Sequence, residues 1–278
     1  MKATARVTLP LLTLDVVATL ERAVRDGQMS VECSLDLGRS RTTVAPEASG
    51  WSWNGQRFPY PDDCRERTVY FWDGGAFRPA ARYDAALVKL VPTEWGPPTF
   101  EIDGIKMLPT ARVSPYADAE RKVATVRPHG KAVLDTCGGL GYFAAWCLKS
   151  GAARILSYEK SAAVLWLRSL NPWSPAAVAR LVLEHADIVA AIARLPDRSV
   201  EAALHDPPRF GIAGELYSEA FYAELARVLC RGARLFHYTG TPNKVSRGRN
   251  LPAEVAARLK RAGFTTESDP DGVIAVKR

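Results

Sequence analysis

Short apolar runs alternate with longer segments of helical periodicity through the second part of the chain. Continuous apolar runs bounded by turn residues predict buried strands, and apolar positions three and four apart predict helices. The expected strands are residues 131–136, 154–159, 181–187, 200–204, 233–238 and 273–276. The expected helices are residues 114–126, 142–149, 188–194, 218–229 and 252–262. This alternation predicts an α/β fold with a Rossmann-like, doubly wound and mainly parallel sheet.

The pattern before residue 110 is irregular and favours strands and turns. Residues 14–26 predict one helix, and residues 87–91 and 99–102 predict strands. Asn54-Gly55 and Asp73-Gly74 are hairpin signals. Many aromatic residues lie among glycine, proline and aspartate in this region. We therefore expect two domains, a small β-rich N-terminal domain over 1–110 and a larger one over 111–278. The aromatic residues of the N-terminal domain are expected either to form its core or to contact RNA.

A glycine-rich turn joins the first predicted strand of the larger domain to its helix. The turn begins at Asp135 and contains Cys137, Gly138, Gly139 and Gly141. Glycines allow the backbone to approach a ligand closely, and a strand, glycine turn and helix open a nucleotide-binding βαβ unit. An acid at the end of the strand favours a ligand with a cationic amine over a pyrophosphate. The alternative is a plain tight turn.

Two further predicted strands also end in acids. Glu159 lies 24 residues after Asp135, near the position that holds a ribose diol in dinucleotide-binding folds. The alternative for Glu159 is a carboxylate that caps the following helix. Asp187 ends the next run and can accept a hydrogen bond from an adenine amino group, or act as the N-cap of the helix after it.

The fourth predicted strand is followed by Asp206, Pro207, Pro208, Arg209 and Phe210. Methyl transfer to a ring-conjugated amine requires acceptors for the NH2 hydrogens, so that the nitrogen can become tetrahedral as it attacks. Asp206 offers a carboxylate, and the carbonyl of Pro207 offers a second acceptor whose direction is fixed by the proline backbone. The segment therefore predicts the amine-binding part of an N-methyltransferase site. The alternative is a proline-rich strand exit without a catalytic role.

These motifs, in this order, resemble a class I S-adenosylmethionine (SAM)-dependent methyltransferase. The resemblance covers roughly residues 100–278 and is closer to an archaeal group similar to the enzymes that make N4-methylated cytidine in ribosomal RNA. The strings that carry it are DTCGGLGY at 135–142, NPWS at 171–174, HDPPRF at 205–210, AGELYS at 213–218, FHYTG at 236–240 and DGIKM at 103–107.

The resemblance implies SAM as the cofactor and a final antiparallel strand near the C-terminus. Members of this type place an aromatic residue after Pro-Pro to stack on the base. Here Arg209 occupies that position and Phe210 follows. Either the ring of Phe210 or the planar guanidinium of Arg209 is expected to cover the base.

The charge distribution favours an RNA substrate. The chain carries a formal net charge of +7. Residues 1–110 hold 13 basic and 14 acidic residues, whereas residues 111–278 hold 24 and 16. Basic surface around a site attracts phosphates, although any single arginine more often lies on a solvated helix face. The candidate RNA-binding residues are Lys244, Arg247 and Arg249, with Arg258, Lys260 and Arg261 on the following helix.

Composition bounds the remaining possibilities. No run of about 18 apolar residues predicts a membrane span, and residues 1–14 fit a secretory signal poorly, so we expect a cytoplasmic protein. The five cysteines have no CxxC spacing, and no metal site is expected. Asparagine occurs four times and glutamine twice, a depletion that suggests a thermophile, in which an internal disulfide is possible.

Two other functions fit parts of the pattern. One is an aminopropyl transferase similar to spermidine synthase, which shares the expected fold and would need an acidic groove for a polyamine. The other is a binding protein that has kept the fold and lost catalysis. The three acids Asp135, Glu159 and Asp206 favour an active enzyme over that second alternative.

Overall fold

The computed structural model describes residues 9–240 and 250–278. The chain forms two compact units. The first contains Met1–Pro115 together with Trp166–Ser174, and the second contains Tyr116–Leu165 and Pro175–Arg278.

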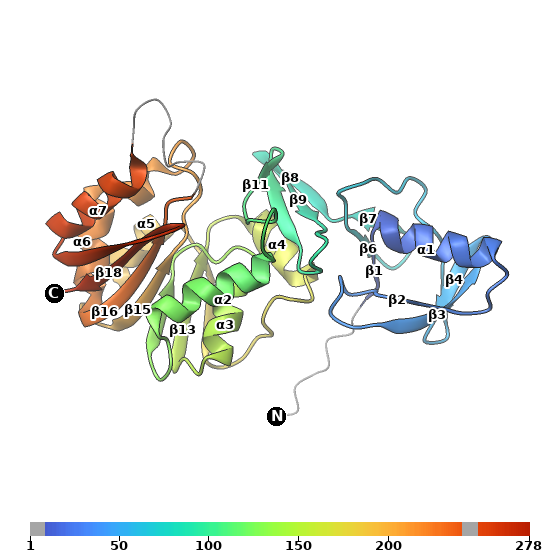
Figure 1. Cartoon of the computed structure of the whole chain (residues 1–278), viewed down its shortest axis with the longest axis horizontal. Helices are drawn as coiled ribbons and strands as arrows, with labels where there is room; N and C mark the ends of the chain where they lie inside the picture. The colour runs from blue at the N-terminus through green and yellow to red at the C-terminus, as the bar shows by residue number, and fades with distance from the viewer. Residues whose placement is uncertain (1–8, 241–249) are drawn as a thin grey trace. The chain divides into compact units, whose positions relative to one another are not determined.

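A seven-stranded sheet forms the centre of the second unit (Figure 1). Its order is β14-β13-β12-β15-β16-β18-β17, and every neighbouring pair is parallel except the two pairs that involve β18. The fold class is therefore confirmed, and so is the antiparallel strand near the C-terminus. The strands are β12 (Ala132–Asp135), β13 (Arg154–Glu159), β14 (Leu181–His185), β15 (Val200–His205), β16 (Leu229–Tyr238), β17 (Phe264–Asp269) and β18 (Gly272–Lys277).

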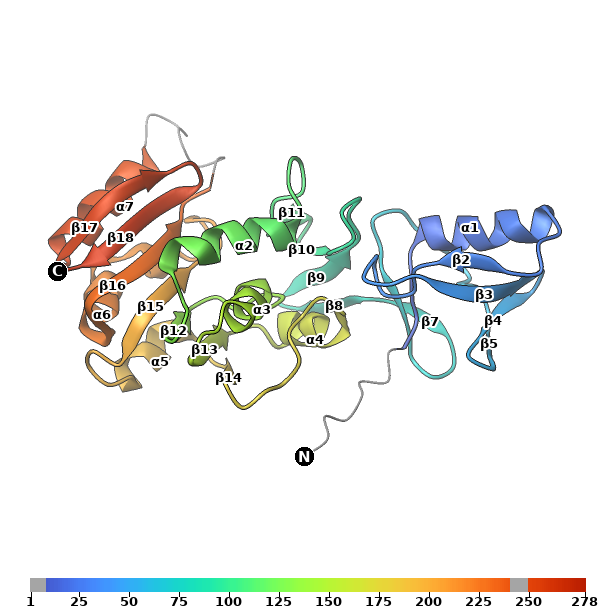
Figure 2. The same cartoon turned by 60° about the horizontal axis from the view of Figure 1, so that its bottom comes forward.

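Helices cover both faces of this sheet, as expected for parallel strands that are buried on both sides. The helices are α2 (Pro115–Val126), α3 (Tyr142–Lys149), α4 (Ala162–Leu170), α5 (Ile188–Ala191), α6 (Glu219–Val228) and α7 (Leu251–Arg261), with 3-10 turns at Ile192–Arg194 and Gly214–Tyr217. Leu134 and Leu235 belong to one core cluster with the apolar faces of α5, α6 and α7. Figure 2 shows α2 on the opposite side of the sheet from α6 and α7.

Local sequence explains where these helices begin. Ser218 caps α6 by accepting from Phe221 N, and Asn250 caps α7 by accepting from Ala253 N. The sequence predicted five of these helices and missed one strand. The missed strand is β17 at the sheet edge, in which only Phe264 is buried. The helix predicted over 188–194 is split into α5 and a 3-10 turn.

In the residues that the structure describes, the first unit contains the helix α1 (Leu14–Arg25), the last part of α4 and three small sheets. The helix α1 begins at the N-cap Thr13. One sheet joins β1 (Leu11–Leu12), β6 (Tyr70–Trp72) and β7 (Phe77–Pro79); another joins β2 (Val31–Cys33), β3 (Thr42–Glu47), β4 (Gly50–Trp53) and β5 (Gln56–Phe58); the last joins β8 (Ala81–Asp84), β9 (Ala86–Val91), β10 (Thr99–Ile102) and β11 (Ile105–Lys106). Asn54 and Gly55 make the β4–β5 turn with φ of 49° and 76°, as the hairpin signal predicted.

Aromatic residues form the core of the first unit. Trp51 stacks on Phe58 with ring centroids 4.7 Å apart, and Phe58 meets Trp72 edge-on at 5.3 Å. All three side chains are buried, together with Phe77. For these rings the structure supports the core interpretation rather than contact with RNA.

Candidate functional site

The glycine-rich turn connects β12 to α3 in the second unit. Gly138 N donates to Tyr158 O at 2.7 Å, which fastens the turn to β13. Gly139 and Gly141 have φ of 48° and 84°, a left-handed conformation that strains other residues. Cys137 is packed in the same turn, and burial raises the pKa of its thiol well above the ordinary value. Cys137 therefore stays protonated and acts as a packing residue.

Asp135 and Glu159 lie at neighbouring strand ends. Asp135 is buried, and its Oδ2 accepts from Ser157 Oγ at 2.8 Å. Glu159 Oε2 accepts from Gly139 N and Oε1 accepts from Ser161 N, both at 2.9 Å. The Glu159 carboxylate thus joins the glycine turn to the start of α4. The hydrogen bond from Ser161 N is the helix-capping contact that the sequence offers as the alternative to ribose binding.

Asp187 has the geometry of a helix N-cap. Its Oδ1 accepts from Val189 N at 2.9 Å, which caps α5, and its Oδ2 lies 3.3 Å from Lys160 Nζ. The capping alternative is therefore realised. Contact with an adenine amino group stays a prediction.

A buried hydrogen-bonded bridge links β12 to β15. Thr136 Oγ1 lies 2.7 Å from His205 Nδ1, and His205 Nε2 lies 3.0 Å from Leu216 O. Because a carbonyl can only accept, Nε2 carries the proton and Nδ1 accepts from the Thr136 hydroxyl. Burial lowers the pKa of His205 to about 4, so the ring is neutral near pH 7. The sequence analysis did not single out this bridge.

A second buried histidine, His237 on β16, lies against the first. The two imidazole centroids are 4.5 Å apart and perpendicular, and Tyr222 Oη lies 2.7 Å from His237 Nε2. Burial lowers the pKa of His237 well below its ordinary value. The buried side chains of His205 and His237 are therefore polar but uncharged.

The Asp-Pro-Pro segment begins directly after β15. Asp206 retains 15% of its side-chain surface exposed, Pro207 is buried and Arg209 is exposed. Tyr217 Oη donates to Pro208 O at 3.0 Å, and the rings of Phe210 and Tyr217 meet edge-on at 5.4 Å. The carbonyl of Pro208 is thus held by the chain itself. Burial raises the pKa of Asp206 to about 6.

An ion cluster beside Asp206 was missed by the sequence analysis. Lys122 on α2 is 1% exposed, and its Nζ lies 2.6 Å from Asp118 Oδ2 and 3.8 Å from Asp206 Oδ2. The same ammonium lies 4.1 Å from the ring centroid of Tyr238. Asp118 and Lys122 are four apart in the predicted helix, a spacing that usually marks a solvated ion pair, so spacing alone did not reveal their burial.

The candidate RNA-binding residues fall in two groups. Lys244, Arg247 and Arg249 lie outside the described residues. On α7, Arg258 Nη1 donates to Tyr217 O at 2.8 Å, and Arg261 Nε lies 3.1 Å from Glu219 Oε1. These two arginines tie α7 to the segment around α6, and Lys260 beside them is exposed.

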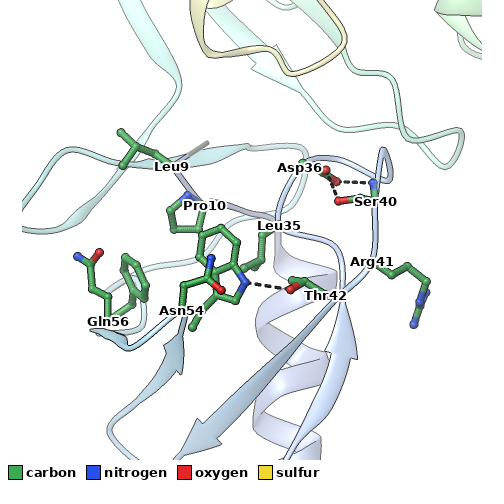
Figure 3. A pocket seen from close by; sticks show the side chains of 11 residues that line it. Leu9, Pro10, Leu35, Asp36, Ser40, Arg41, Thr42, Asn54 and Gln56 are labelled. Carbon is green, nitrogen blue, oxygen red and sulfur yellow. Dashed lines mark hydrogen bonds between the residues drawn. The ribbon is translucent and has the colours of Figure 1, made fainter. Parts of the chain in front are cut away.

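A pocket of about 480 Å³ lies in the first unit (Figure 3). Trp53 forms part of its lining, and the indole Nε1 donates to Thr42 Oγ1 at 2.9 Å. At the rim, Asp36 Oδ1 accepts from Ser40 N at 2.8 Å and Oδ2 accepts from Ser40 Oγ at 2.6 Å. The rim polar groups are thus engaged in holding their own loop.

Metal-ligand groups, membrane-spanning helices and disulfides are absent from the part of the chain that the structure describes. Residues 9–240 and 250–278 bring together no group of three histidine, cysteine or acidic side chains suited to a metal ion. Within the same residues no helix has the length and apolar character needed to cross a membrane. All five cysteines are free thiols, so the disulfide considered from the composition is not formed.

The strand order and the site define the class of fold. A central sheet in this order, with one antiparallel strand and a glycine turn after the first strand, is the class I SAM-dependent methyltransferase fold, which spermidine synthases share. A spermidine synthase structure in complex with the transition-state analogue AdoDATO matches with a TM-score of 0.56 at 15% identity, over 70% of each chain. A putative SAM-dependent methyltransferase from Listeria monocytogenes matches at a TM-score of 0.45 and 13% identity, over 58% of this chain and 99% of that one.

Sequence comparison gives the family. The uncharacterized protein MJ1233 of Methanocaldococcus jannaschii is 42% identical over 219 residues, which are 76% of this chain and 74% of that protein. The chain belongs to the same family as this archaeal protein. No family model matches the sequence.

Proposed function

We propose that the chain is a SAM-dependent N-methyltransferase that modifies an exocyclic base amine in RNA, with cytidine N4 of ribosomal RNA as the target. One observation carries the proposal. In the parallel pair β12–β15, Asp135 is opposite Leu204, and Asp206 follows two residues later. The two acids thus leave the same edge of the sheet from adjacent strands, where open α/β sheets bind their ligands, and this supports Asp135 as the cofactor-binding acid and Asp206 as the amine-binding acid.

The residues around the glycine turn fit SAM. Asp135 and the backbone of Gly138 to Gly141 would hold the methionine end, and Glu159 would accept from the ribose hydroxyls. The left-handed φ angles of Gly139 and Gly141 support a turn built for close approach. When bound, SAM supplies an electrophilic methyl group on a sulfonium sulfur.

The chain's own residues would orient the acceptor amine. Asp206 would accept one amine hydrogen and the Pro207 carbonyl another, so that the nitrogen lone pair points along the line of displacement. The nitrogen would then be aligned to bond to the methyl carbon, while the sulfonium sulfur of SAM would keep the electron pair of the carbon–sulfur bond. The amine proton is then acidic and can pass to Asp206 or to water. Alignment rather than strong base catalysis therefore accounts for most of the barrier reduction.

The base would be covered by a neighbouring side chain. Phe210 packs against Tyr217, which fixes the ring edge-on and supports it as a stacking surface. Arg209 is exposed and is free to contact the phosphate next to the base. The basic excess of residues 111–278 supports a polyanionic substrate.

The spermidine synthase match supports a second candidate, an aminopropyl transferase, because that fold comparison covers 70% of both chains. Such an enzyme needs unpaired carboxylates for a polyamine. Here the Lys122 ammonium forms an ion pair with Asp118 and lies 3.8 Å from Asp206. Arg121 pairs with Asp269 and Asp271. The carboxylates around Asp206 are thus already paired with cations of the chain, and this favours the methyltransferase over an enzyme that binds a polyamine.

Nucleoside mass spectrometry tests the two candidates together. Ribosomal RNA is incubated with the full chain and methyl-labelled SAM, digested and analysed, and Asp206→Ala serves as the inactive control. A parallel reaction contains decarboxylated SAM and putrescine. Labelled N4-methylcytidine in the first reaction is the expected result. Spermidine in the second reaction, with no methylated nucleoside in the first, would replace the proposal with the aminopropyl transferase.

A further inference from the structure

The buried ammonium of Lys122 is an unusual feature so close to a site for a neutral amine. Only 1% of the Lys122 side chain is exposed, and 7% of Asp118. A buried charge is tolerated when it is paired and hydrogen-bonded. Asp118 at 2.6 Å already satisfies that need, yet the same nitrogen also lies 3.8 Å from Asp206.

Asp118 and Asp206 share the Lys122 ammonium, and Arg121 Nη2 lies a further 3.9 Å from Asp118 Oδ1. If Asp118 and Lys122 compensate each other, Asp206 is the group whose charge is least supported. Burial raises the pKa of Asp206 to about 6, Lys122 lowers it, and Asp118 and Asp271 raise it. Among the charged neighbours of Asp206, Lys122 is the one that lowers its pKa and so favours the ionised carboxylate, and its ammonium lies 3.8 Å away.

The charge state of Asp206 decides which hydrogen bonds it can make. An ionised carboxylate only accepts, whereas a protonated one presents a hydroxyl donor on one oxygen. A donor facing an amine NH2 would oppose the orientation that methyl transfer needs. The Lys122 ammonium is in turn held in place by the ring of Tyr238 at 4.1 Å, which favours a cation over its face.

We infer that Lys122 is the positioning residue of the acceptor site, whose ammonium, shared between Asp118 and Asp206, keeps the Asp206 carboxylate ionised and directed at the substrate amine. This inference rests on the proposed function. Lys122 does not contact the reacting atoms; it acts through Asp206.

Other charged or titratable groups also face Asp206. Asp271 follows β17, and Tyr217, Tyr238 and Cys137 come from three further segments. Burial raises the pKa values of both tyrosines and of the thiol, so these three stay neutral over the working pH range. Arg121 pairs with Asp269 and Asp271 and also lies 3.9 Å from Asp118, so it acts on Asp206 only through these carboxylates. Lys122 and Asp118 are thus the pair through which the charge on Asp206 can be changed in opposite directions.

Two substitutions test the inference because their effects have opposite signs. Lys122→Met removes the cation and should move the Asp206 titration midpoint upward by about one pH unit or more, whereas Asp118→Asn removes an anion and should move it downward. The midpoint is measured by NMR on the full chain with ¹³C-labelled aspartate carboxyls, and the Asp206 signal is assigned by its loss in Asp206→Asn. Lys122→Arg keeps the charge and should leave the midpoint near its original value.

The methylation rate is measured against pH in the same variants. The acidic limb of the turnover profile should follow the NMR midpoint, while the affinity for SAM stays constant. The double variant Lys122→Met/Asp118→Asn avoids an unpaired buried aspartate, and should still titrate above the unsubstituted chain because Lys122 is the stronger influence on Asp206.

The possible results separate the inference from the proposed function. Midpoints that do not move, or that move in the same direction in both single variants, overturn the role of Lys122 whatever the activity. Opposite shifts by NMR with no matching change in the methylation profile keep the electrostatic control but overturn the placement of Asp206 at the acceptor amine.

Discussion

Glu159→Ala is the most direct test of how the second unit would hold SAM. The substitution removes a carboxylate whose two oxygens accept from Gly139 N and Ser161 N, both at 2.9 Å. One of these bonds fixes the glycine turn and the other fixes the start of α4. The same carboxylate is the proposed acceptor for the ribose hydroxyls, so one change affects both the ligand contact and the loop that surrounds it.

The magnitude follows from the number of hydrogen bonds. A hydrogen bond to a charged group contributes about 1.5–3 kcal/mol, and Glu159 is half-buried, so the lower end applies to each bond. We expect the free energy of unfolding to fall by about 2–3 kcal/mol. Losing the ribose contact should weaken SAM binding at least tenfold, which is about 1.4 kcal/mol.

Isothermal calorimetry with SAM measures the affinity, and denaturant unfolding measures the stability. Glu201→Ala is a matched control, because Glu201 Oε2 also accepts from a backbone N–H, that of Ala132, at 2.9 Å at the opposite end of β12. The control should lose stability without losing SAM affinity. A Glu159→Ala chain that binds SAM as tightly as the unsubstituted chain would refute the ribose assignment.

Three other predictions concern the acceptor site, the buried histidines and the RNA surface. Asp206→Ala should lower turnover about a hundredfold, or about 2.7 kcal/mol, with SAM affinity unchanged, and Asp206→Asn should keep more activity; single-turnover rates decide, and a near-normal rate in the alanine variant would move the active site elsewhere. The folded-state pKa of His205 is about 4, below the unfolded value, so its contribution to stability is complete above about pH 6.5 and is lost as the pH falls towards 4. Denaturant unfolding should therefore show a loss of about 2 kcal/mol from His205 between pH 7 and pH 5, and a His205→Gln chain with an unchanged pH dependence would contradict this. RNA affinity should fall steeply with salt, and charge reversal at Lys244, Arg247 and Arg249 should flatten that slope. A salt-insensitive affinity would exclude a phosphate-binding role for these three residues.

The sequence predicted most reliably the residues that end a buried strand, because the apolar run itself locates them. Buried parallel strands read as apolar runs, so the acids that end them, Asp135 and Glu159, mark the carboxyl edge of the sheet. The strand β17 was missed because an edge strand needs apolar residues on only one side, and the sequence FTTESD carries few. Its place in the sheet depends on pairing with β18, which no local pattern states.

The missed parts of the site depend on contacts between distant residues. Lys122 and Asp206 lie 3.8 Å apart but 84 positions apart in sequence, and a charged pair on a helix gives no sign that the helix face is covered. Thr136 and His205 meet because β12 and β15 are neighbours. The two roles considered for Asp187 were equally compatible with its spacing, and only coordinates distinguish the N-cap geometry.

Because Asp135 and Asp206 leave adjacent parallel strands, the separation between the backbones of the two proposed binding acids depends on the distance between neighbouring strands, about 4.8 Å in any sheet. That spacing belongs to the backbone ladder and cannot be altered by exchanging side chains. The part of the chain that can change is the segment from Asp206 to Tyr217, which follows the strand and carries no ladder hydrogen bonds. Under the proposed function, a different acceptor would therefore require substitutions only within the twelve positions 206–217, while the sheet would keep the methyl donor in the same place.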